Sequence, residues 1–330
     1  MSDRPHIPVM LDSVLRASDV QNGDIVIDAT FGFGGYSEAL LRVADTHVFG
    51  LDRDPTVRPR AAQLSEQYAG RFLLVETPFS KMDRVDLPQA DVIVFDVGVS
   101  SMQIDQPNRG FSFQKDGPLD MRMSRSGPTA RDAIMRLDED ELAALFRVYG
   151  EERHARRAAR RLVEARADAP IDTTLQLAEI IEAVIGRSGK IHPATRIFQA
   201  LRIFVNDELG ELYRGLCAAE NLLSPGGRLV VVTFHSLEDR IAKQFLRDRA
   251  GEVAGGSRYA PAVEKTGPPA TFILSRRSTI KPSRAEELAN PRARSAKLRV
   301  GIRTDAPVQA CDPSAWIPKG ASLPSLEQLA

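Results

Sequence analysis

Apolar and polar residues follow two different rhythms between residues 23 and 101. Four short runs are rich in β-branched and aliphatic side chains, as expected for buried strands, and they lie at residues 23–30, 47–55, 71–80 and 90–101. After the first two runs, apolar residues recur every three to four positions, the spacing of amphipathic helices, at residues 36–45 and 55–69. Strands that alternate with helices in this way favour an α/β fold with a doubly wound parallel sheet.

The rhythm changes at residue 105. A stretch rich in Gly, Pro, Asn and Asp is followed by three helical patterns, at residues 137–150, 151–168 and 173–186. A long amphipathic helix is predicted at 195–223, and strand-like runs then return at 224–235, 271–279 and 296–303. We therefore predict a discontinuous α/β domain at 1–104 and 196–303, an inserted all-helical substrate-recognition domain at 105–195 and an irregular tail at 304–330.

A glycine-rich turn follows the first predicted strand, in the sequence DATFGFGGYS from Asp28 to Ser37. Glycine lets the backbone of such a turn approach a ligand, and the helix that follows presents free N–H groups. The dinucleotide pattern G-x-G-x-x-G starts at Gly32 but meets Ser37 where it needs its third glycine. The looser pattern D-x-x-x-G-x-G-G of S-adenosylmethionine enzymes fits from Asp28 to Gly35. A turn that only packs the helix on the sheet is the structural alternative.

Three of the predicted strands end in an aspartate, and these residues are Asp28, Asp52 and Asp96. The carboxyl ends of parallel strands share one edge of the sheet, which is where open α/β sheets bind ligands. Asp52 lies about twenty residues after the glycine turn, which is the sequence separation at which the acid of a nucleotide-binding site accepts hydrogen bonds from ribose hydroxyls. Because NAD sites use the same acid, it predicts a nucleoside ligand without choosing between the two cofactors.

Several longer motifs narrow the interpretation. They are HIPVML from His6, FDVGVSSMQID, NRGFSFQKDGPLDMRM, HPATRIFQALRIFVNDELGEL, SPGGRLVVVTFHSLEDRIAKQF and NPRARSAKLRV. Together they closely resemble the bacterial MraW/RsmH family, from His6 to about Arg303. The resemblance implies a Rossmann-like class I methyltransferase that uses S-adenosyl-L-methionine to methylate the N4 amine of one cytidine in the decoding centre of 16S ribosomal RNA.

The resemblance also implies which residues bind the cofactor. The matching positions are Gly34, Gly35, Tyr36, Asp52, Phe79, Asp96 and Gln103. Two positions depart from the family pattern, which usually has histidine in place of Tyr36 and proline in place of Met102. We expect the first change to leave a backbone contact and the second to alter the stiffness of the loop more than its chemistry.

Methyl transfer to a cytosine amine needs a hydrogen-bond acceptor beside that amine, because its lone pair is delocalised into the ring. Asp96, with the carbonyls of the turn after it, is in the place where amine methyltransferases of this class keep such acceptors, and a loop-capping role is its alternative. His235 ends the fifth predicted strand at the same edge. It is a candidate catalytic residue, or it only closes a hydrogen bond while Ser236 caps the next helix, with Glu238 and Asp239 in its first turn.

Candidate RNA contacts come from aromatic and basic residues. Phe111 and Phe113 are candidates for stacking on a base that has left its helix, or they pack the long loop. Arg122 contacts RNA or orders that loop in an ion pair with Asp120. Basic residues also cluster on a predicted helix, at 153–161, and near the C-terminus, where Arg292, Arg294 and Lys297 are the candidates for phosphate contacts. Solvated faces paired with acids are the alternative for both clusters.

Composition limits these hypotheses only weakly. The 330 residues include 44 basic and 44 acidic side chains, so RNA binding has to come from local clusters rather than from net charge. Cys217 and Cys311 stand far apart with no Cys or His pattern around them. We therefore expect neither a metal site nor a disulfide, as is usual in a cytoplasmic protein.

The partners expected from this reading are 16S ribosomal RNA or the small ribosomal subunit, and no membrane. The N-terminal residues lack the apolar core of a signal peptide, and no run of about 18 apolar residues occurs. The oligomeric state stays open, a homodimer included. Three other functions also stay open: a methyltransferase of the same fold acting on DNA or a small molecule, a nicotinamide-dependent oxidoreductase, and an RNA-binding assembly factor without activity.

Overall fold

The computed structural model describes residues 8–99, 101–124, 126–187, 192–251, 267–274, 279–312, 314–318 and 322–329. His6, the first residue of the motif HIPVML, lies outside them. The chain forms two compact units, and each is described by itself. The sheet unit comprises Met1–Gly98 and Leu209–Trp316, and the helical unit comprises Val99–Glu208 and Ile317–Ala330.

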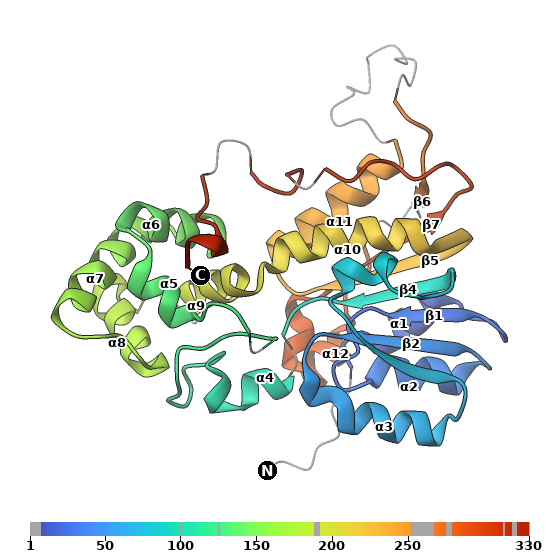
Figure 1. Cartoon of the computed structure of the whole chain (residues 1–330), viewed down its shortest axis with the longest axis horizontal. Coiled ribbons are helices and arrows are strands. Elements are labelled where there is room, and N and C mark those ends of the chain that lie inside the picture. The colour runs from blue at the N-terminus through green and yellow to red at the C-terminus, as the bar shows by residue number, and fades with distance from the viewer. Residues whose placement is uncertain are drawn as a thin grey trace. The chain divides into compact units, whose positions relative to one another are not determined.

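A seven-stranded sheet forms the centre of the sheet unit (Figure 1). Its strands are β1 (Ile25–Asp28), β2 (His47–Asp52), β3 (Phe72–Glu76), β4 (Ala90–Asp96), β5 (Leu223–Thr233), β6 (Phe272–Leu274) and β7 (Lys297–Arg303). They are ordered β3-β2-β1-β4-β5-β7-β6, and β1 to β5 are parallel. The sequence predicted a parallel sheet, but β7 is inserted antiparallel between β5 and β6.

Helices cover both faces of this sheet. Figure 1 shows α1 (Leu11–Ser18), α2 (Gly35–Val43) and α3 (Arg58–Gln67) on one side, and α10 (Glu208–Leu222) and α11 (Ser236–Arg249) on the other. The central strands are buried from both sides, which explains why β4 and β5 have consecutive apolar residues, at 92–95 and 229–232, instead of alternating ones. Short helices complete the unit: η1 (Pro55–Val57), η2 (Phe79–Arg84), α12 (Arg284–Ala289) and η4 (Pro291–Ser295).

The helical unit consists of helices, three of which have starts that are marked in the sequence. The helices are α4 (Ser101–Asp105), η3 (Pro107–Arg109), α5 (Ala130–Arg136), α6 (Glu139–Val148), α7 (Ala155–Asp168), α8 (Thr174–Ile185), α9 (Ala194–Asn206) and η5 (Leu326–Leu329). Capping boxes begin three of them: Thr129 with Asp132, Asp138 with Glu141, and Thr173 with Gln176. Each box satisfies backbone N–H groups that the first helical turn leaves without a partner.

The boundaries differ from those predicted. The inserted unit runs from Val99 to Glu208 instead of 105–195. The single helix predicted at 195–223 is broken at Asp207, whose left-handed backbone (φ 48°) ends α9 before α10 begins at Glu208. The periodicity of apolar residues continues across this break, so the sequence pattern does not reveal it.

The tail is not simply irregular. Its residues up to Trp316 belong to the sheet unit and those from Ile317 belong to the helical unit, where η5 packs on α5. Leu329 is buried there, and its carbonyl accepts a hydrogen bond from Arg136 Nη1 at 2.6 Å.

Cys217 and Cys311 form a disulfide, with Cα atoms 6.0 Å apart, so the expectation of no disulfide is wrong. The cause is a long-range contact that cysteine spacing does not reveal. Arg249 of α11 donates to Glu220 at 2.7 Å and to the carbonyl of Ala310 at 3.0 Å, which holds the tail against α10 beside Cys217.

No described helix is long and apolar enough to cross a membrane.

Candidate functional site

Two glycines of the turn after β1 are required by the packing around them. Gly34 has a left-handed backbone (φ 72°), and a Cβ there would lie 2.8 Å from the ring of Phe31. A Cβ on Gly35 would lie 2.3 Å from Pro8. The close fit therefore accounts for part of the motif, as the structural alternative supposed. Gly32, in contrast, has open space on its Cβ side, with its nearest neighbour at 3.7 Å.

Asp52, at the end of β2, holds this turn. One carboxylate oxygen accepts the N–H of Gly32 at 2.8 Å, and the other accepts the N–H of Asp54 at 2.8 Å. Burial raises the pKa of Asp52, although both hydrogen bonds oppose the shift. Each carboxylate oxygen keeps a second lone pair, so the residue can fix the loop and still accept a hydrogen bond from a ribose hydroxyl.

The side chain of Tyr36 is enclosed within the protein. It is only 3% exposed, and its hydroxyl donates to the carbonyl of Val9. Burial, with the charges of Asp96 and Asp28, raises its pKa well above the ordinary value. The part of this residue that can reach a ligand is its backbone, in the first turn of α2.

Asp28, the last residue of β1, is 1% exposed and has no cationic partner among the described residues. It accepts the hydroxyl of Ser37 at 2.7 Å and the N–H of Thr30 at 3.2 Å. Burial raises the pKa of Asp28 to about 6, against these hydrogen bonds. Ser37 thus has a structural reason: where a dinucleotide turn has its third glycine, this chain has a donor to a buried carboxylate.

Asp96, the last residue of β4, lies at the same edge. Its backbone N–H donates to the hydroxyl of Thr30 at 2.6 Å. Its Oδ1 is enclosed and has no hydrogen-bond partner among the described residues. Burial raises the pKa of Asp96 to about 8, and the charges of Asp28 and Glu238 add to the effect. A buried carboxyl with an unsatisfied oxygen and a raised pKa is a candidate for proton transfer.

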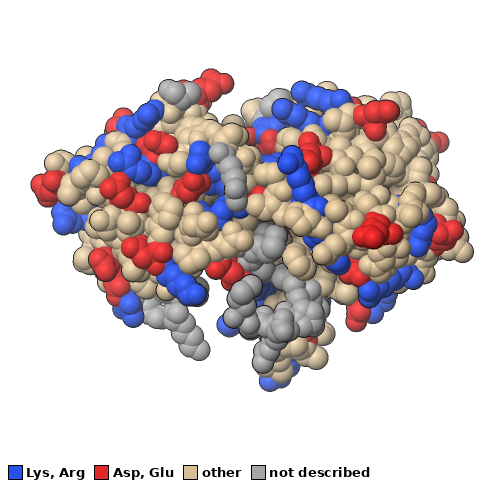
Figure 2. Space-filling view, turned by 60° about the horizontal axis from the view of Figure 1, so that its bottom comes forward, with Lys and Arg blue, Asp and Glu red and all other residues tan. Residues whose placement is uncertain are grey.

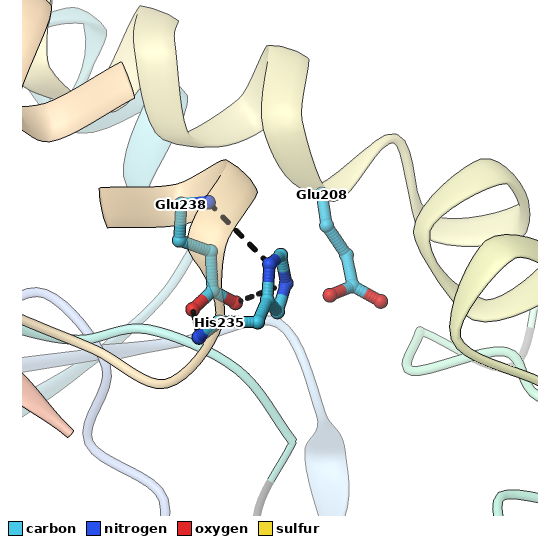
Figure 3. Close-up of side chains that lie close together, drawn as sticks. All are labelled: Glu208, His235 and Glu238. Atoms are coloured by element: carbon cyan, nitrogen blue, oxygen red, sulfur yellow. Dashed lines mark hydrogen bonds and ion pairs between the residues drawn. The ribbon is translucent and has the colours of Figure 1, made fainter. Parts of the chain in front are cut away.

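His235 and Glu238 form a reciprocal cap at the start of α11 (Figure 3). The imidazole Nδ1 accepts the N–H of Glu238 at 3.4 Å, and Glu238 Oε2 accepts the N–H of Phe234 at 2.7 Å. Nε2 lies 2.9 Å from Glu238 Oε1. The cap residue is therefore His235 and not Ser236, which is the first residue of the helix. His235 does close hydrogen bonds, as its structural alternative supposed.

Phe79 of η2 is half-buried. Its ring packs edge-on against Phe95 of β4, with centroids 5.5 Å apart, and a Cβ on Gly215 would lie 2.5 Å from it. The ring is therefore held in one place next to the site end of β4.

Gln103, the other predicted cofactor contact, lies in α4 of the helical unit and is buried. The same unit holds the predicted aromatic contacts. Phe113 packs against His192 and Phe198, with ring centroids 4.7 and 4.9 Å apart, which supports the loop-packing alternative for this residue. The guanidinium of Arg109 lies 5.8 Å from the centre of the Phe111 ring.

Arg122 orders its loop. Its Nε and Nη2 atoms donate to the two oxygens of Asp120 at 2.9 and 2.7 Å. Burial alone would raise the pKa of Asp120, but the hydrogen bonds and charge of Arg122 outweigh it and lower the pKa. Of the two roles considered for Arg122, the structure thus shows the ion pair.

The two basic clusters differ in their partners. On α7, Arg156 pairs with Asp140, and Arg160 lies 3.6 Å from Glu139, so much of that face is a solvated ion-pair network. In η4, Arg292 and Arg294 are both exposed. The ammonium of Lys297 is 2.7 Å from Asp239. In the space-filling view, acidic and basic side chains are interspersed over the described surface that faces the viewer (Figure 2).

Sequence reasoning missed the contacts that three residues make at the site edge, namely Thr30, Ser37 and Glu238. The capping-box spacing of His235 and Glu238 was readable in HSLE, but the box is usually built on Ser or Thr. Thr30 and Ser37 carried no signal, because their partners are fixed only when β1, β4 and α2 come together.

The strand order, with a glycine turn after β1 and acids at the ends of β1, β2 and β4, defines a Rossmann-like fold of the class I methyltransferase type. Residues 3–304 match the model of the MraW methylase family, and the chain belongs to this family.

Its relatives include proteins named ribosomal RNA small subunit methyltransferase H. The protein from Maricaulis maris is 58% identical over 95% of this chain and 96% of its own length. The protein from Brucella suis is 50% identical over 98% of this chain and 94% of its own length. A solved rRNA methylase from Streptococcus thermophilus aligns only weakly, with a TM-score of 0.40 at 10% identity over 89% of this chain and 94% of that one. The family assignment rests on the sequence relatives.

Proposed function

We propose that the protein transfers the methyl group of S-adenosyl-L-methionine to the N4 amine of a cytidine in 16S ribosomal RNA. The observation that carries this proposal is the enclosed acidic edge of the sheet, where Asp96 has an unsatisfied carboxylate oxygen and neither Asp28 nor Asp96 has a cationic partner among the described residues. The names of the relatives support the choice of small-subunit ribosomal RNA as substrate.

The charge of this edge fits the cofactor. S-adenosylmethionine carries a positive sulfonium, a positive amino group and one carboxylate, so acidic side chains attract its net positive charge, whereas the pyrophosphate of a dinucleotide would be repelled. The close-packed turn at Gly34 and Gly35 gives backbone access, and Asp52 offers lone pairs to the ribose. Phe79 supplies an apolar face for the adenine ring. The nicotinamide alternative fits this edge poorly for the same electrostatic reason.

When bound, S-adenosylmethionine supplies a methyl group on a positively charged sulfur. The residues of this chain then have to hold the amine in line with that methyl, and positioning of this kind can contribute roughly 7–11 kcal/mol at best. Asp96 accepts a hydrogen bond from the N4 amine, which returns the lone pair of the nitrogen from the ring to the reacting position. As the new N–C bond forms, Asp96 takes the proton that the amine must lose.

The acceptor has to enter the site as a base turned out of its stack, because an enclosed carboxylate cannot reach the N4 atom within an RNA helix. Arg292 and Arg294 are the exposed basic groups that we assign to phosphate contacts. Phe111, half-buried beside Arg109, is the better remaining candidate for stacking on the base. Action in the cytoplasm follows from this substrate and belongs to the same proposal.

Two measurements test the function. Calorimetric titration compares S-adenosylmethionine with NADH, and only the first is expected to bind. Mass spectrometry of 16S ribosomal RNA nucleosides then compares cells with the protein, cells without it and cells with Asp96→Asn. N4-methylated cytidine is expected only with the wild-type protein. An unchanged level in cells that lack the protein contradicts the proposed substrate, and in that case methylation of DNA or a small molecule is the next function to test.

A further inference from the structure

Glu238 is the acid at the site edge to which the proposed reaction gives no task. It is completely buried at the start of α11, and it belongs to the turn that leaves β5. We propose that Glu238 is a positioning residue that acts through Asp96: its fixed negative charge strengthens Asp96 as the acceptor of the proton that the methylated amine loses. This inference rests on the proposed function and assigns a further residue to the same site.

The location of Glu238 is set by the pairing of β4 with β5. Asp96 is in register with Val232, and the N–H of Val97 donates to the carbonyl of Val232 at 2.9 Å, so the turns after both strands leave the sheet side by side. In the β4 turn, Gly98 has a positive φ of 123°, and a Cβ there would lie 3.9 Å from Glu238 Oε1. Glu238 therefore reaches across from α11 to the turn that follows Asp96.

The carboxylate of Glu238 cannot swing away from this position. Its Oε2 accepts the N–H groups of Phe234 and His235, at 2.7 and 3.2 Å. Because His235 Nδ1 accepts a backbone N–H, its proton is assigned to Nε2, the nitrogen that lies 2.9 Å from Glu238 Oε1. The carboxylate of Glu238 is thus oriented by two backbone N–H groups, with the imidazole close to its other oxygen.

Among the described residues, the charged groups that raise the pKa of Asp96 are both carboxylates. They are Asp28 at the end of β1 and Glu238 on α11, while the hydroxyl of Tyr36 on α2 is neutral and bonded to Val9. A like charge disfavours ionisation of a carboxyl, so Glu238 contributes to the raised pKa of Asp96. A carboxylate with a higher pKa binds a proton more tightly and is the stronger base.

The step balances as follows. The lone pair of the amine nitrogen forms the N–C bond, the C–S bond breaks, and its electron pair stays on sulfur, which becomes a neutral thioether. The proton from the amine moves to the carboxylate of Asp96, which becomes a neutral carboxylic acid. Glu238 exchanges no atoms in this step. It lowers the cost of the proton transfer because a neutral Asp96 no longer repels it.

Glu238→Gln tests the inference, because glutamine keeps the capping interaction while removing the charge. Without the like charge, the pKa of Asp96 falls, so the acid limb of the kcat against pH profile should move down by about one pH unit. The weaker base should lower the plateau kcat about tenfold, while the Kd for S-adenosylmethionine changes by less than about threefold. Glu238→Asp keeps the charge and should leave the acid limb near its wild-type position.

Asp239→Asn is the matched control. It removes one negative charge from the same helical turn, but Asp239 faces Lys297 and Arg299, at 2.7 and 2.8 Å, instead of Asp96. We expect a lower Tm and no movement of the acid limb. If Glu238→Gln leaves the limb in place, or if Asp239→Asn moves it equally, the inference about Glu238 is wrong. A wild-type protein that does not methylate RNA would instead contradict the proposed function.

Discussion

Buried charges at the acidic edge of the sheet differ from buried charges elsewhere in the molecule. In the helical unit, Arg202 donates through Nε and Nη2 to the buried Glu208, at 2.8 and 2.9 Å. In the sheet unit, Arg249 pairs with the buried Glu220 at 2.7 Å in the same way. Arg109 of the helical unit, also buried, donates to the carbonyls of Arg122 and Met123 at 2.9 and 3.0 Å. At the carboxyl edge of the sheet unit, the carboxylate of Asp28 accepts only from hydroxyl and N–H groups among the described residues, and Oδ1 of Asp96 has no hydrogen-bond partner among them.

The difference separates charges that maintain the fold from charges that perform chemistry. A buried ion pair recovers much of what each partner loses on leaving water, so it is tolerated wherever the fold needs a polar contact. Unpaired carboxylates recover little of that loss, and a site that keeps them gives up stability in order to receive a cationic ligand or a proton. The effect of a substitution on stability tells the two kinds of charge apart. Loss of an ion-pair partner lowers the free energy of unfolding, whereas neutralising an unpaired buried carboxylate raises it.

The largest effect is expected from Asp96→Asn. The amide cannot take the proton from the amine, so we expect kcat to fall by about 10³-fold, within the range of general base catalysis. Single-turnover transfer of labelled methyl to ribosomal RNA measures the change, and calorimetry of S-adenosylmethionine binding checks that the cofactor site is intact. A loss of less than tenfold would exclude Asp96 as the proton acceptor.

The second prediction concerns the buried ion pair of the helical unit, whose loss should lower stability. Arg202→Met leaves Glu208 buried without its bidentate partner, and we expect the helical unit to lose about 3 kcal/mol of stability. Chemical denaturation monitored by circular dichroism measures this loss. Arg58→Met, which removes an exposed pair with Glu76, serves as control and should cost less than about 1 kcal/mol. Equal losses in both variants would contradict the contrast between buried and exposed pairs.

The acidic edge also makes stability depend on pH. The pKa values of Asp28 and Asp96 are raised to about 6 and about 8, so above pH 4 the folded protein holds protons that the unfolded chain has released. Stability without cofactor should therefore fall as pH rises from about 4 to 8. We expect Asp96→Asn to make the fall in the free energy of unfolding smaller by about 1–2 kcal/mol. The full pKa shift would give more, but Asp96 is half-buried as a residue, and solvent weakens the effect.

Thermal unfolding at pH 5 and pH 8 measures this dependence. Addition of S-adenosylmethionine should raise the Tm more at pH 8 than at pH 5, because Asp28 is charged and Asp96 is partly charged at the higher pH. Parallel Tm profiles for wild type and Asp96→Asn would show that the buried carboxylate does not titrate in this range.

The smallest effect separates the two arginine clusters. Arg292→Ala with Arg294→Ala should weaken RNA binding and reduce the slope of log K against log salt by about 1.4–1.8, the value for two phosphate contacts. Arg156→Ala with Arg160→Ala should change the slope little, because these side chains are engaged with Asp140 and Glu139. Filter binding over a salt series gives both slopes. If the two double variants lower the slope equally, the assignment of phosphate contacts to Arg292 and Arg294 over the α7 arginines is wrong.

The parts of this structure that could be predicted from sequence are those encoded over a few neighbouring residues. The glycine turn, the acids at the strand ends and the helical insertion all follow from local pattern. Asp28 with Ser37, Tyr36 with Val9 and Cys217 with Cys311 could not be foreseen, because each pair meets only through packing of separate elements. The same reason hid the break at Asp207, where apolar periodicity continues although the backbone turns.

The insertion between β4 and β5 has a consequence for how the chain is made. β4 cannot pair with β5 until residues 97–222 have left the ribosome, which takes roughly 6–25 s at about 5–20 residues per second. During that time one side of β4 is an open strand edge with unpaired backbone groups, and such edges promote aggregation. If residues 99–208 fold early, α10 and β5 emerge from the ribosome after a segment that is already compact. This shortens the time for which the edge of β4 stays unpaired. Synthesis of the protein is thus expected to be more sensitive to chaperone supply and to translation rate than the stability of the finished molecule suggests.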